Sequence, residues 1–209
     1  NRFENTAGGI DASAGSISGA EISRNRFESL TGPGIQGQLE SCLVVDNLFA
    51  YGNSVGISLF EDFLGSPPSN ASVDNFVLLN CFYQNLGTAM SFSASQAAGT
   101  ISTNTAWFND IVENTVGSAY SGAETIDVTS NYWGAADGPS GDGPGSGDPV
   151  LGAGLDFSSF LVAPATYPTH CHPVADLSIT KVDDAHDAYA VVGAPVIYTI
   201  TVENLGPFD

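Results

Sequence analysis

The first three quarters of the sequence predict an all-β solenoid whose short strands stack, coil upon coil, into parallel sheets. Three observations support this fold class. An Asn recurs two residues before a large aromatic residue, at intervals in the twenties except for one longer interval. Short apolar or β-branched runs alternate with Gly, Asn and Ser, and no run shows the 3.6-residue periodicity of an amphipathic helix. A repeat of this length, rich in strand and turn signals, is typical of a solenoid.

The repeat consists of an Asn and an aromatic residue that follows it. The pairs are Asn1/Phe3, Asn25/Phe27, Asn47/Phe49, Asn80/Phe82 and Asn131/Trp133, with Ala106/Phe108 in register but lacking the Asn. The aromatic residues are separated by 24, 22, 33, 26 and 25 residues. We expect each Asn to occupy a left-handed bend and to bond to its counterparts in the coils above and below. We expect each aromatic ring to point inward and stack.

Two other segments interrupt the repeat. The 33-residue interval carries an insertion near residues 61–70, where two prolines predict a surface loop, and Asn70-Ala71-Ser72 forms a glycosylation sequon. Residues 135–150 are so rich in Gly, Pro and Asp that we expect no regular strand there. We interpret them, with the apolar segment 154–161, as a return loop that covers the open end of the solenoid.

The closing segment gives the first resemblance to a known family. It runs through Asn131-Tyr132-Trp133-Gly134, then Gly138-Pro139, Gly147-Asp148-Pro149-Val150 and Leu155-Asp156-Phe157-Ser158-Ser159-Phe160-Leu161. This order resembles the closing segment of right-handed parallel β-helix repeat proteins of the pectin-lyase-like superfamily, which are common in large secreted or surface-attached bacterial proteins. The resemblance covers residues 1–162 and implies a right-handed parallel β-helix.

Residues 163–174 are rich in proline and predict an extended linker. A second module begins at residue 175. Alternation places Leu177 and Ile179 on one face of a strand, and Tyr198, Ile200 and Val202 on the apolar face of another. We expect these five residues to form a subunit contact.

The second module also resembles a known family. It begins with Ala175-Asp176-Leu177-Ser178-Ile179-Thr180-Lys181 and continues with Tyr198-Thr199-Ile200-Thr201-Val202-Glu203-Asn204-Leu205-Gly206-Pro207. Both stretches resemble the immunoglobulin-like domain repeated in bacterial surface proteins, the DUF11 family. The resemblance implies that residues 175–209 are the first strands of an incomplete immunoglobulin-like module. Such a sandwich needs about seven strands. Three completions stay open: truncation of a longer chain, packing on the chain's own β-helix, or strands from a neighbouring copy.

Composition excludes several classes of partner. The formal charge is −19, from 23 acidic residues against four basic ones. This balance argues against nucleic acid and against anionic lipid, because both bind through cations. No run of eighteen apolar residues is present, so we expect no membrane insertion. Both ends fall inside patterns, so we expect a longer polypeptide. The two resemblances imply that it is located outside the cell or at its surface.

Candidate cysteine and metal chemistry is sparse. The three cysteines, Cys42, Cys81 and Cys171, leave two alternatives open, buried free thiols or a bridge in an oxidising compartment. His170-Cys171-His172 lacks further ligands nearby in the sequence, and we expect no metal there. The loop carboxylates Asp137, Asp142 and Asp148 are weak calcium candidates, and we otherwise expect no cofactor.

No catalytic constellation emerges from the sequence. Glycoside cleavage needs two carboxylates, and a lyase needs a basic residue. The only arginines, Arg2, Arg24 and Arg26, lie in the first coils, where salt bridges to Glu4 and Glu28 explain them equally well. We therefore expect a non-catalytic structural or adhesive segment, a filament subunit completed by strand exchange. Its partners would be other copies, further domains of the polypeptide, or surface polysaccharide. The alternative is a carbohydrate-active β-helix, a lyase or hydrolase, whose catalytic coils are missing or N-terminal.

Overall fold

The computed structural model describes residues 1–60, 72–94, 101, 103–122, 124–165, 177–183 and 198–204. The chain divides into two compact units, Asn1–Cys171 and His172–Asp209. Every described residue in a regular element belongs to a β-strand, which confirms the all-β class. The insertion predicted at residues 61–70 and most of the linker lie outside the described residues.

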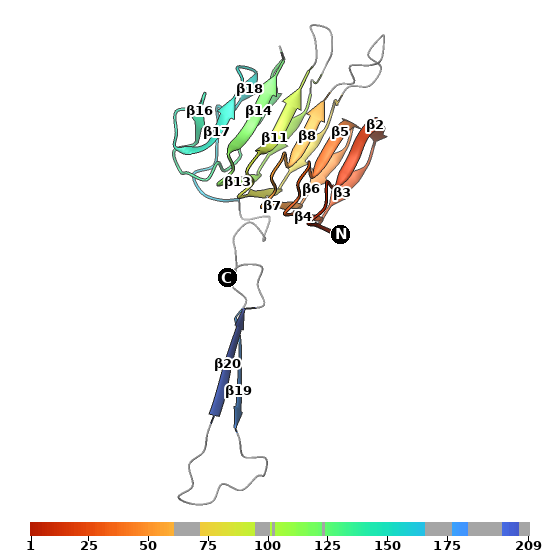
Figure 1. The fold of residues 1–209 in the computed structure, drawn as a ribbon. Helices are drawn as coiled ribbons and strands as arrows, with labels where there is room; N and C mark the ends of the chain where they lie inside the picture. Colours follow the sequence, from red (N-terminus) through yellow and green to blue (C-terminus); the bar gives the residue numbers. More distant parts are fainter. Residues whose placement is uncertain are drawn as a thin grey trace, which may run out of the picture. The chain divides into compact units, whose positions relative to one another are not determined.

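The strands of the first unit form three parallel sheets, and successive strands pass from one sheet to the next (Figure 1). Sheet 1 contains β1 (Arg2–Glu4), β4 (Arg26–Glu28), β7 (Leu48–Ala50), β10 (Cys81–Tyr83) and β13 (Asp110–Val112). Sheet 2 contains β2 (Ile10–Ser18), β5 (Ile35–Glu40), β8 (Ile57–Phe60), β11 (Thr88–Ser93), β14 (Val116–Ser121), β17 (Gly147–Leu151) and β16 (Pro139–Gly141). Sheet 3 contains β3 (Glu21–Ser23), β6 (Leu43–Val45), β9 (Phe76–Leu78), β12 (Thr105–Trp107), β15 (Ile126–Asp127) and β18 (Leu155–Asp156). From β1 to β15 each coil contributes one strand to each sheet, which is a parallel β-helix-like arrangement.

The core lies inside the coils because alternate residues of a strand point to opposite faces. In the three-residue strands of sheet 1 the middle residue is the inward one, and Phe27, Phe49, Phe82 and Ile111 follow one another in register. Each of these four side chains is at most 2 % exposed. No single coil buries its own apolar residues; each is covered by the coils on either side.

The left-handed bends lie one residue earlier than the sequence predicts. At the corner between sheets 3 and 1 the residues with positive φ are Arg24, Asp46, Leu79, Phe108 and Ser130, at 54° to 56°. Each directly precedes a ladder Asn, and none of the five is buried. The bend thus falls on a residue whose side chain reaches solvent. The Asn itself stays out of the left-handed region and directs its amide along the stack.

Two further expectations are wrong. Phe108 is not a core residue: it occupies the bend position and is 45 % exposed, while Asn109 and Ile111 take the ladder and core positions of that coil. Residues 135–150 contain regular structure, since β17 pairs with β14 and continues sheet 2. Pairing with the parallel strand β14 stabilises β17 as a strand, although its Gly- and Pro-containing sequence does not favour that conformation.

The second unit contains an antiparallel pair of strands. β19 (Leu177–Asp183) pairs with β20 (Tyr198–Asn204) over seven residue pairs. Opposite residues share a face in such a pair, so Ile179 lies beside Val202 and Lys181 beside Ile200 on one face. Thr180 and Thr201 lie on the other.

Candidate functional site

The main chemical feature of the first unit is a row of asparagine amides, buried at every position except Asn1. The structure places Asn1, Asn25, Asn47, Asn80, Asn109 and Asn131 in this row. The Asn80 Oδ1 accepts bonds from the Asn47 backbone N–H and Nδ2, both at 3.0 Å. Its Nδ2 donates to Asn109 Oδ1 at 3.1 Å and to the Val44 carbonyl at 2.8 Å. Each interior amide therefore satisfies backbone groups at the bend as well as its neighbours in the row.

Two more rows, which the sequence interpretation missed, mark the other corners. Asn85 and Asn114 form one of them, which ends on Asp148, and Asn75 and Asn104 form the other. The signal was present in the sequence. Asparagines recur every five residues at Asn75, Asn80, Asn85 and again at Asn104, Asn109, Asn114. In these two coils, a ladder Asn therefore bounds each strand of sheets 3 and 1 at both ends, namely β9, β10, β12 and β13.

Aromatic rings form a second continuous row beside the first ladder. The ring centroids of Phe3 and Phe27, of Phe27 and Phe49, and of Phe49 and Phe82 are separated by 4.9, 4.7 and 4.9 Å, with interplanar angles of 6° to 7°. Ile111 occupies the next position. Trp133, which is fully buried, follows it, because Asp110 and Tyr132 are bridged in register. Phe27, Phe49, Phe82 and Trp133 thus lie in one stack.

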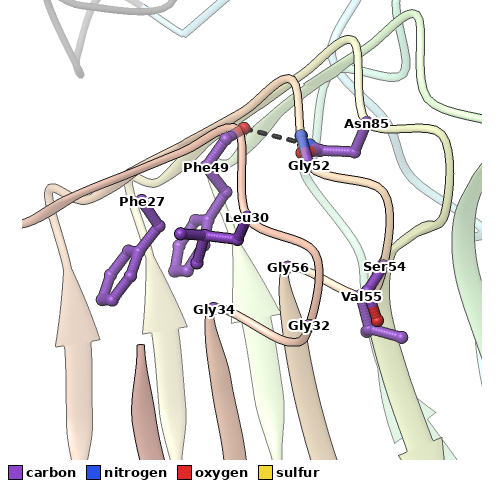
Figure 2. Close-up of a pocket in the computed structure, with 10 residues that line it drawn as sticks. All are labelled: Phe27, Leu30, Gly32, Gly34, Phe49, Gly52, Ser54, Val55, Gly56 and Asn85. Atoms are coloured by element: carbon purple, nitrogen blue, oxygen red, sulfur yellow. Dashed lines mark hydrogen bonds between the residues drawn. The ribbon is translucent and has the colours of Figure 1, made fainter. Parts of the chain in front are cut away.

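Small residues make room for these rings. A Cβ atom at Gly34 would lie 2.7 Å from the Phe49 ring, and one at Gly56 would lie 2.8 Å from the Phe82 ring. Figure 2 shows these glycines beside the aromatic row. The cavity drawn there has a volume of about 10 Å³, roughly the space of one water molecule. It is a packing gap, and no small-molecule site follows from it.

The arginines of the first coils, which were considered as catalytic residues, form ion pairs with neighbouring carboxylates. Arg2 lies 3.2 Å from Glu4 and 3.1 Å from Glu28, which stack directly on one another in β1 and β4. Arg26 lies 2.7 Å from Glu28, and Arg24 lies 3.5 Å from Asp46. These ion pairs neutralise like charges that the parallel register brings together. The arrangement is explained by stacking of the coils.

The three calcium candidates lie apart, Asp137 and Asp142 in hydrogen-bonded turns and Asp148 in β17. Asp137 accepts bonds from the Ser146 backbone N–H and hydroxyl, which lower its pKa, and Asp142 accepts one from the Gly152 N–H. Asp148 belongs to the ladder that contains Asn114, and burial raises its pKa. Within the described ranges, no three His, Cys, Asp or Glu side chains gather closely enough to bind a metal ion.

The outer face of sheet 3 carries an apolar surface. Leu43 and Phe76 are neighbours in one outward row, and Leu78 and Trp107 are neighbours in the next. Phe76 is 45 % exposed, as is Phe108, which follows Trp107 at the corner. Polar residues bound this surface on both sides, with Glu21 in β3 and Asp127 in β15. This exposed apolar surface, flanked by carboxylates, is a candidate contact surface.

The two described cysteines differ in their bonding state. Cys42 is free and buried at a corner, where its Sγ lies 3.3 Å from the Ile17 carbonyl oxygen. Cys81 is disulfide-bonded and fully buried on the outer side of sheet 1. It forms a small apolar cluster with Leu48 and Ala50, against which Tyr51 and Tyr83 pack. Burial raises the pKa of Tyr51 to about 12. Cys171 lies outside the described residues.

The expected contact residues of the second unit lie in its two strands. Ile179, Ile200 and Val202 are between 60 % and 67 % exposed. Leu177 and Tyr198 lie in the same strands, at opposite ends of the pairing. The antiparallel pair therefore presents three large and mostly exposed apolar side chains on one face.

These features define an all-β protein of stacked parallel sheets joined to an antiparallel pair of strands. Comparison with protein-family models, with curated proteins and with solved structures found no match to this chain. The part of the chain that the structure describes contains no helical stretch of the length and hydrophobicity that a membrane crossing requires.

Proposed function

We propose that the chain is a non-catalytic structural or adhesive segment of a large secreted or cell-surface protein. In this proposal residues 1–162 form a right-handed β-helix of the pectin-lyase-like type. Residues 175–209 begin an immunoglobulin-like module of the DUF11 type, and its missing strands come from another copy. The observation that carries the proposal is the exposed apolar face of β19 and β20, where Ile179, Ile200 and Val202 are at least 60 % exposed.

A two-stranded pair is marginally stable at best in water, and three or more strands with a shared apolar face are needed. Burying Ile179, Ile200 and Val202 under further strands would contribute about 1.5 to 3 kcal/mol for each side chain. Strand addition supplies this apolar cover together with backbone hydrogen bonds. The free energy gained by burying these three side chains is large enough to drive association, which supports assembly as the role of the module.

Two features of the first unit support an extracellular structural role. The disulfide at Cys81 fits an oxidising compartment, because such bonds persist mainly in secreted and surface proteins. The apolar surface with Phe76, Trp107 and Phe108 offers an adhesive contact. The charge of −19 keeps the free chain soluble by self-repulsion.

The test is self-association of the full chain, measured by sedimentation velocity over a concentration series at 0.5 M NaCl to screen repulsion. We expect concentration-dependent assemblies of the parent chain. We expect the double variant Ile179→Lys/Val202→Lys to remain monomeric, because two charges would enter the buried contact.

The matched control is Thr180→Lys/Thr201→Lys, which adds the same charge on the opposite face of the same strands. We expect this variant to assemble like the parent. A parent chain that stays monomeric at every concentration would overturn strand exchange between copies, as would equal effects of the two double variants.

A further inference from the structure

Two sheet faces of the chain are apolar and exposed. One is the face of β19 and β20 that carries Ile179, Ile200 and Val202. The other is the apolar surface of sheet 3, which consists of Leu43, Val45, Phe76, Leu78, Trp107 and the corner residue Phe108. We propose that these two faces bind each other between copies of the chain. Sheet 3 of one copy would then be the layer that packs on β19 and β20 of another. The inference rests on the proposed function and names the surface through which the copies assemble.

The two faces have the same spacing of side chains. The face of β19 and β20 consists of two cross-strand pairs, one wholly apolar and one formed by Lys181 and Ile200. The apolar surface of sheet 3 likewise has two outward rows, which cross β9 at Phe76 and Leu78. In both sheets the rows are about 6.6 Å apart and neighbouring strands about 4.8 Å apart. Two such faces can pack about 10 Å apart with their side chains interdigitated.

Charge favours this pairing over pairings of like faces. The face of β19 and β20 contains Lys181, one of the four basic residues of the chain. On sheet 3 the rim is acidic, since Glu21 lies beside Leu43 in register and Asp127 lies beside Thr105. Two sheet 3 surfaces would bring carboxylates together, and two β19–β20 faces would bring lysines together. The mixed contact places opposite charges at its rim, which makes it the electrostatically complementary pairing.

The lysine is compatible with an apolar contact. A lysine side chain can lie along an apolar surface with its methylene groups while its ammonium group stays at the edge. Lys181 shares its face with Ile179, two residues earlier in the same strand. The contact therefore buries three large apolar side chains and directs one cation toward the carboxylates that bound sheet 3.

The contact joins different surfaces of two copies, so each copy can bind two others. A contact of this kind produces a ring where its rotation closes and an open filament where it does not. Pairing of identical surfaces would instead stop at a dimer. The number of copies in the assembly therefore distinguishes the mixed contact from a symmetric one.

The first test uses the two tryptophans of the parent chain, which report on the contact without any substitution. Trp107 lies half-buried on the apolar surface of sheet 3, whereas Trp133 is 0 % exposed inside the coils. We expect acrylamide quenching of tryptophan fluorescence to fall as the parent assembles over a concentration series in 0.5 M NaCl. Assembly without a change in quenching would overturn the proposal, because the surface around Trp107 would then stay open to solvent.

The second test compares substitutions on the two faces. Ile179→Lys/Val202→Lys alters the face of β19 and β20, and Phe76→Lys/Phe108→Lys alters sheet 3 with the same change in charge. Phe76 and Phe108 are each 45 % exposed, so the fold should tolerate both lysines. We expect each double variant alone to weaken self-association by about 100-fold or more in sedimentation velocity, because two charges would enter the contact.

The matched control carries two lysines on the outer face of another sheet. Ser58 and Ser121 lie on the outer face of sheet 2, since their strand neighbours Leu59 and Tyr120 are buried. We expect Ser58→Lys/Ser121→Lys to assemble like the parent. Far-UV circular dichroism and thermal unfolding of all variants check that the fold is retained. Equal loss of assembly in the control would overturn the proposal.

Mixing the two interface variants gives the sharpest measurement. One variant keeps an intact sheet 3 and the other keeps an intact face of β19 and β20, so a mixture contains one functional contact. We expect an equimolar mixture to regain association and to stop at dimers with one copy of each variant. Native mass spectrometry identifies these mixed dimers when one variant is labelled with ¹⁵N. A mixture that stays monomeric would overturn the proposal.

The outcomes separate this inference from the proposed function. A parent chain that stays monomeric at every concentration would overturn the self-association proposed above. An assembling parent with a monomeric Ile179→Lys/Val202→Lys variant and an assembling Phe76→Lys/Phe108→Lys variant would overturn only this inference. Protection of Trp107 from acrylamide by added dextran, at concentrations where the parent is monomeric, would assign the apolar surface of sheet 3 to a sugar and would also overturn it.

Discussion

Each ladder asparagine combines two tasks that no apolar residue combines. Its amide closes hydrogen bonds to backbone groups at a bend, and it links three coils through identical contacts. The preceding residue accepts the left-handed conformation, which costs about 1 to 2 kcal/mol for a residue other than glycine. The buried amide network offsets this cost because each bend would otherwise leave backbone groups unsatisfied.

Replacement of an interior ladder residue tests this interpretation. Asn80→Ala would remove the side-chain partner of the Asn47 backbone N–H and of the Val44 carbonyl, and one of the two donors to Asn109 Oδ1. We expect the free energy of unfolding to fall by roughly 3 kcal/mol, because buried polar groups lose their hydrogen bonds. Urea denaturation measures the change. Asn53→Ala is the control, since Asn53 is exposed and should change stability by less than about 0.5 kcal/mol. Equal effects at the two sites would contradict a stabilising ladder.

Asp148 is a carboxylate at the end of an asparagine row. Its Oδ2 accepts bonds from the Asn114 N–H and Nδ2, both at 2.8 Å. The corresponding Nδ2 atoms of Asn85 and Asn114 donate to the carbonyls of Phe49 and Phe82. The next carbonyl of that row belongs to Ile111. A Cβ at Gly134 would lie 3.5 Å from this oxygen and 3.8 Å from Asp148 Oδ1, so two acceptors approach the same region.

Burial, with the Glu113 carboxylate nearby, raises the pKa of Asp148 above 3.8. The stability from this group is therefore fully present below pH 3.8 and is lost as the pH rises through the folded-state pKa. We expect Asp148→Asn to be more stable than the parent at pH 7 by about 1 kcal/mol, because the amide adds a donor facing the Ile111 carbonyl. The difference should shrink as the pH falls toward 3.8.

Thermal unfolding of both proteins between pH 3.5 and 7.5 checks this expectation. The control is Asp137→Asn, because hydrogen bonds from Ser146 lower the pKa of Asp137. That carboxylate contributes stability above pH 3.8 that is lost as the pH falls, so its variant should show the opposite trend. A less stable Asp148→Asn variant at pH 7 would show that the charge-assisted bonds from Asn114 outweigh burial.

At the scale of elements, sheets 1 and 2 are matched through their side chains. The residues that precede the inward row of sheet 2 are Gly9, Gly34, Gly56, Ala89 and Gly117. The sheet 1 residues of the following coils are Phe27, Phe49, Phe82, Ile111 and Trp133. Glycine faces every aromatic ring, and the single alanine faces the single aliphatic side chain. The residue in sheet 2 is therefore smallest where the facing side chain in sheet 1 is an aromatic ring, and larger where that side chain is isoleucine.

A double-mutant cycle tests this matching. Gly56→Ala places a Cβ 2.8 Å from the Phe82 ring and 2.7 Å from the Ala89 carbonyl, so we expect a loss of about 1 to 3 kcal/mol. Phe82→Ile alone should also destabilise, because it loses stacking and volume. The double variant recreates the pairing of Ala89 with Ile111 and should be more stable than the sum of single effects predicts, by about 1 kcal/mol.

Urea denaturation of the four proteins measures the coupling. Gly15→Ala serves as the control, since a Cβ there meets nothing within 4 Å. Its coupling to Phe82→Ile should be close to zero. Strictly additive effects of Gly56→Ala and Phe82→Ile would show that the glycine row is unrelated to ring size.

At the scale of the whole molecule, parallel stacking brings like residues together, with opposite consequences for apolar and charged groups. Stacked aromatic rings and amides attract each other, whereas stacked carboxylates such as Asp127 and Asp156 repel. Arg2 and Arg26 relieve this repulsion between Glu4 and Glu28. With four basic residues in the chain, most acidic residues have no such partner type available, and the surface stays strongly negative. This charge opposes lateral association and makes an apolar contact such as that of β19 and β20 a stronger basis for assembly.

The repeats in the sequence were sufficient to predict the stacked β architecture, the Asn row and the aromatic row, because these depend on side chains that recur from coil to coil. It also indicated the alternation that places Ile179, Ile200 and Val202 on one face. The tertiary structure alone decided the register at Asn109 and Ile111, since the 29 residues from Asn80 to Asn109 contain extra length and an aliphatic residue replaces the ring. It likewise decided that β17 is a strand and that Cys81 is bridged. The reason is that parallel pairing and disulfides join residues distant in the chain, whose alignment local preferences do not specify.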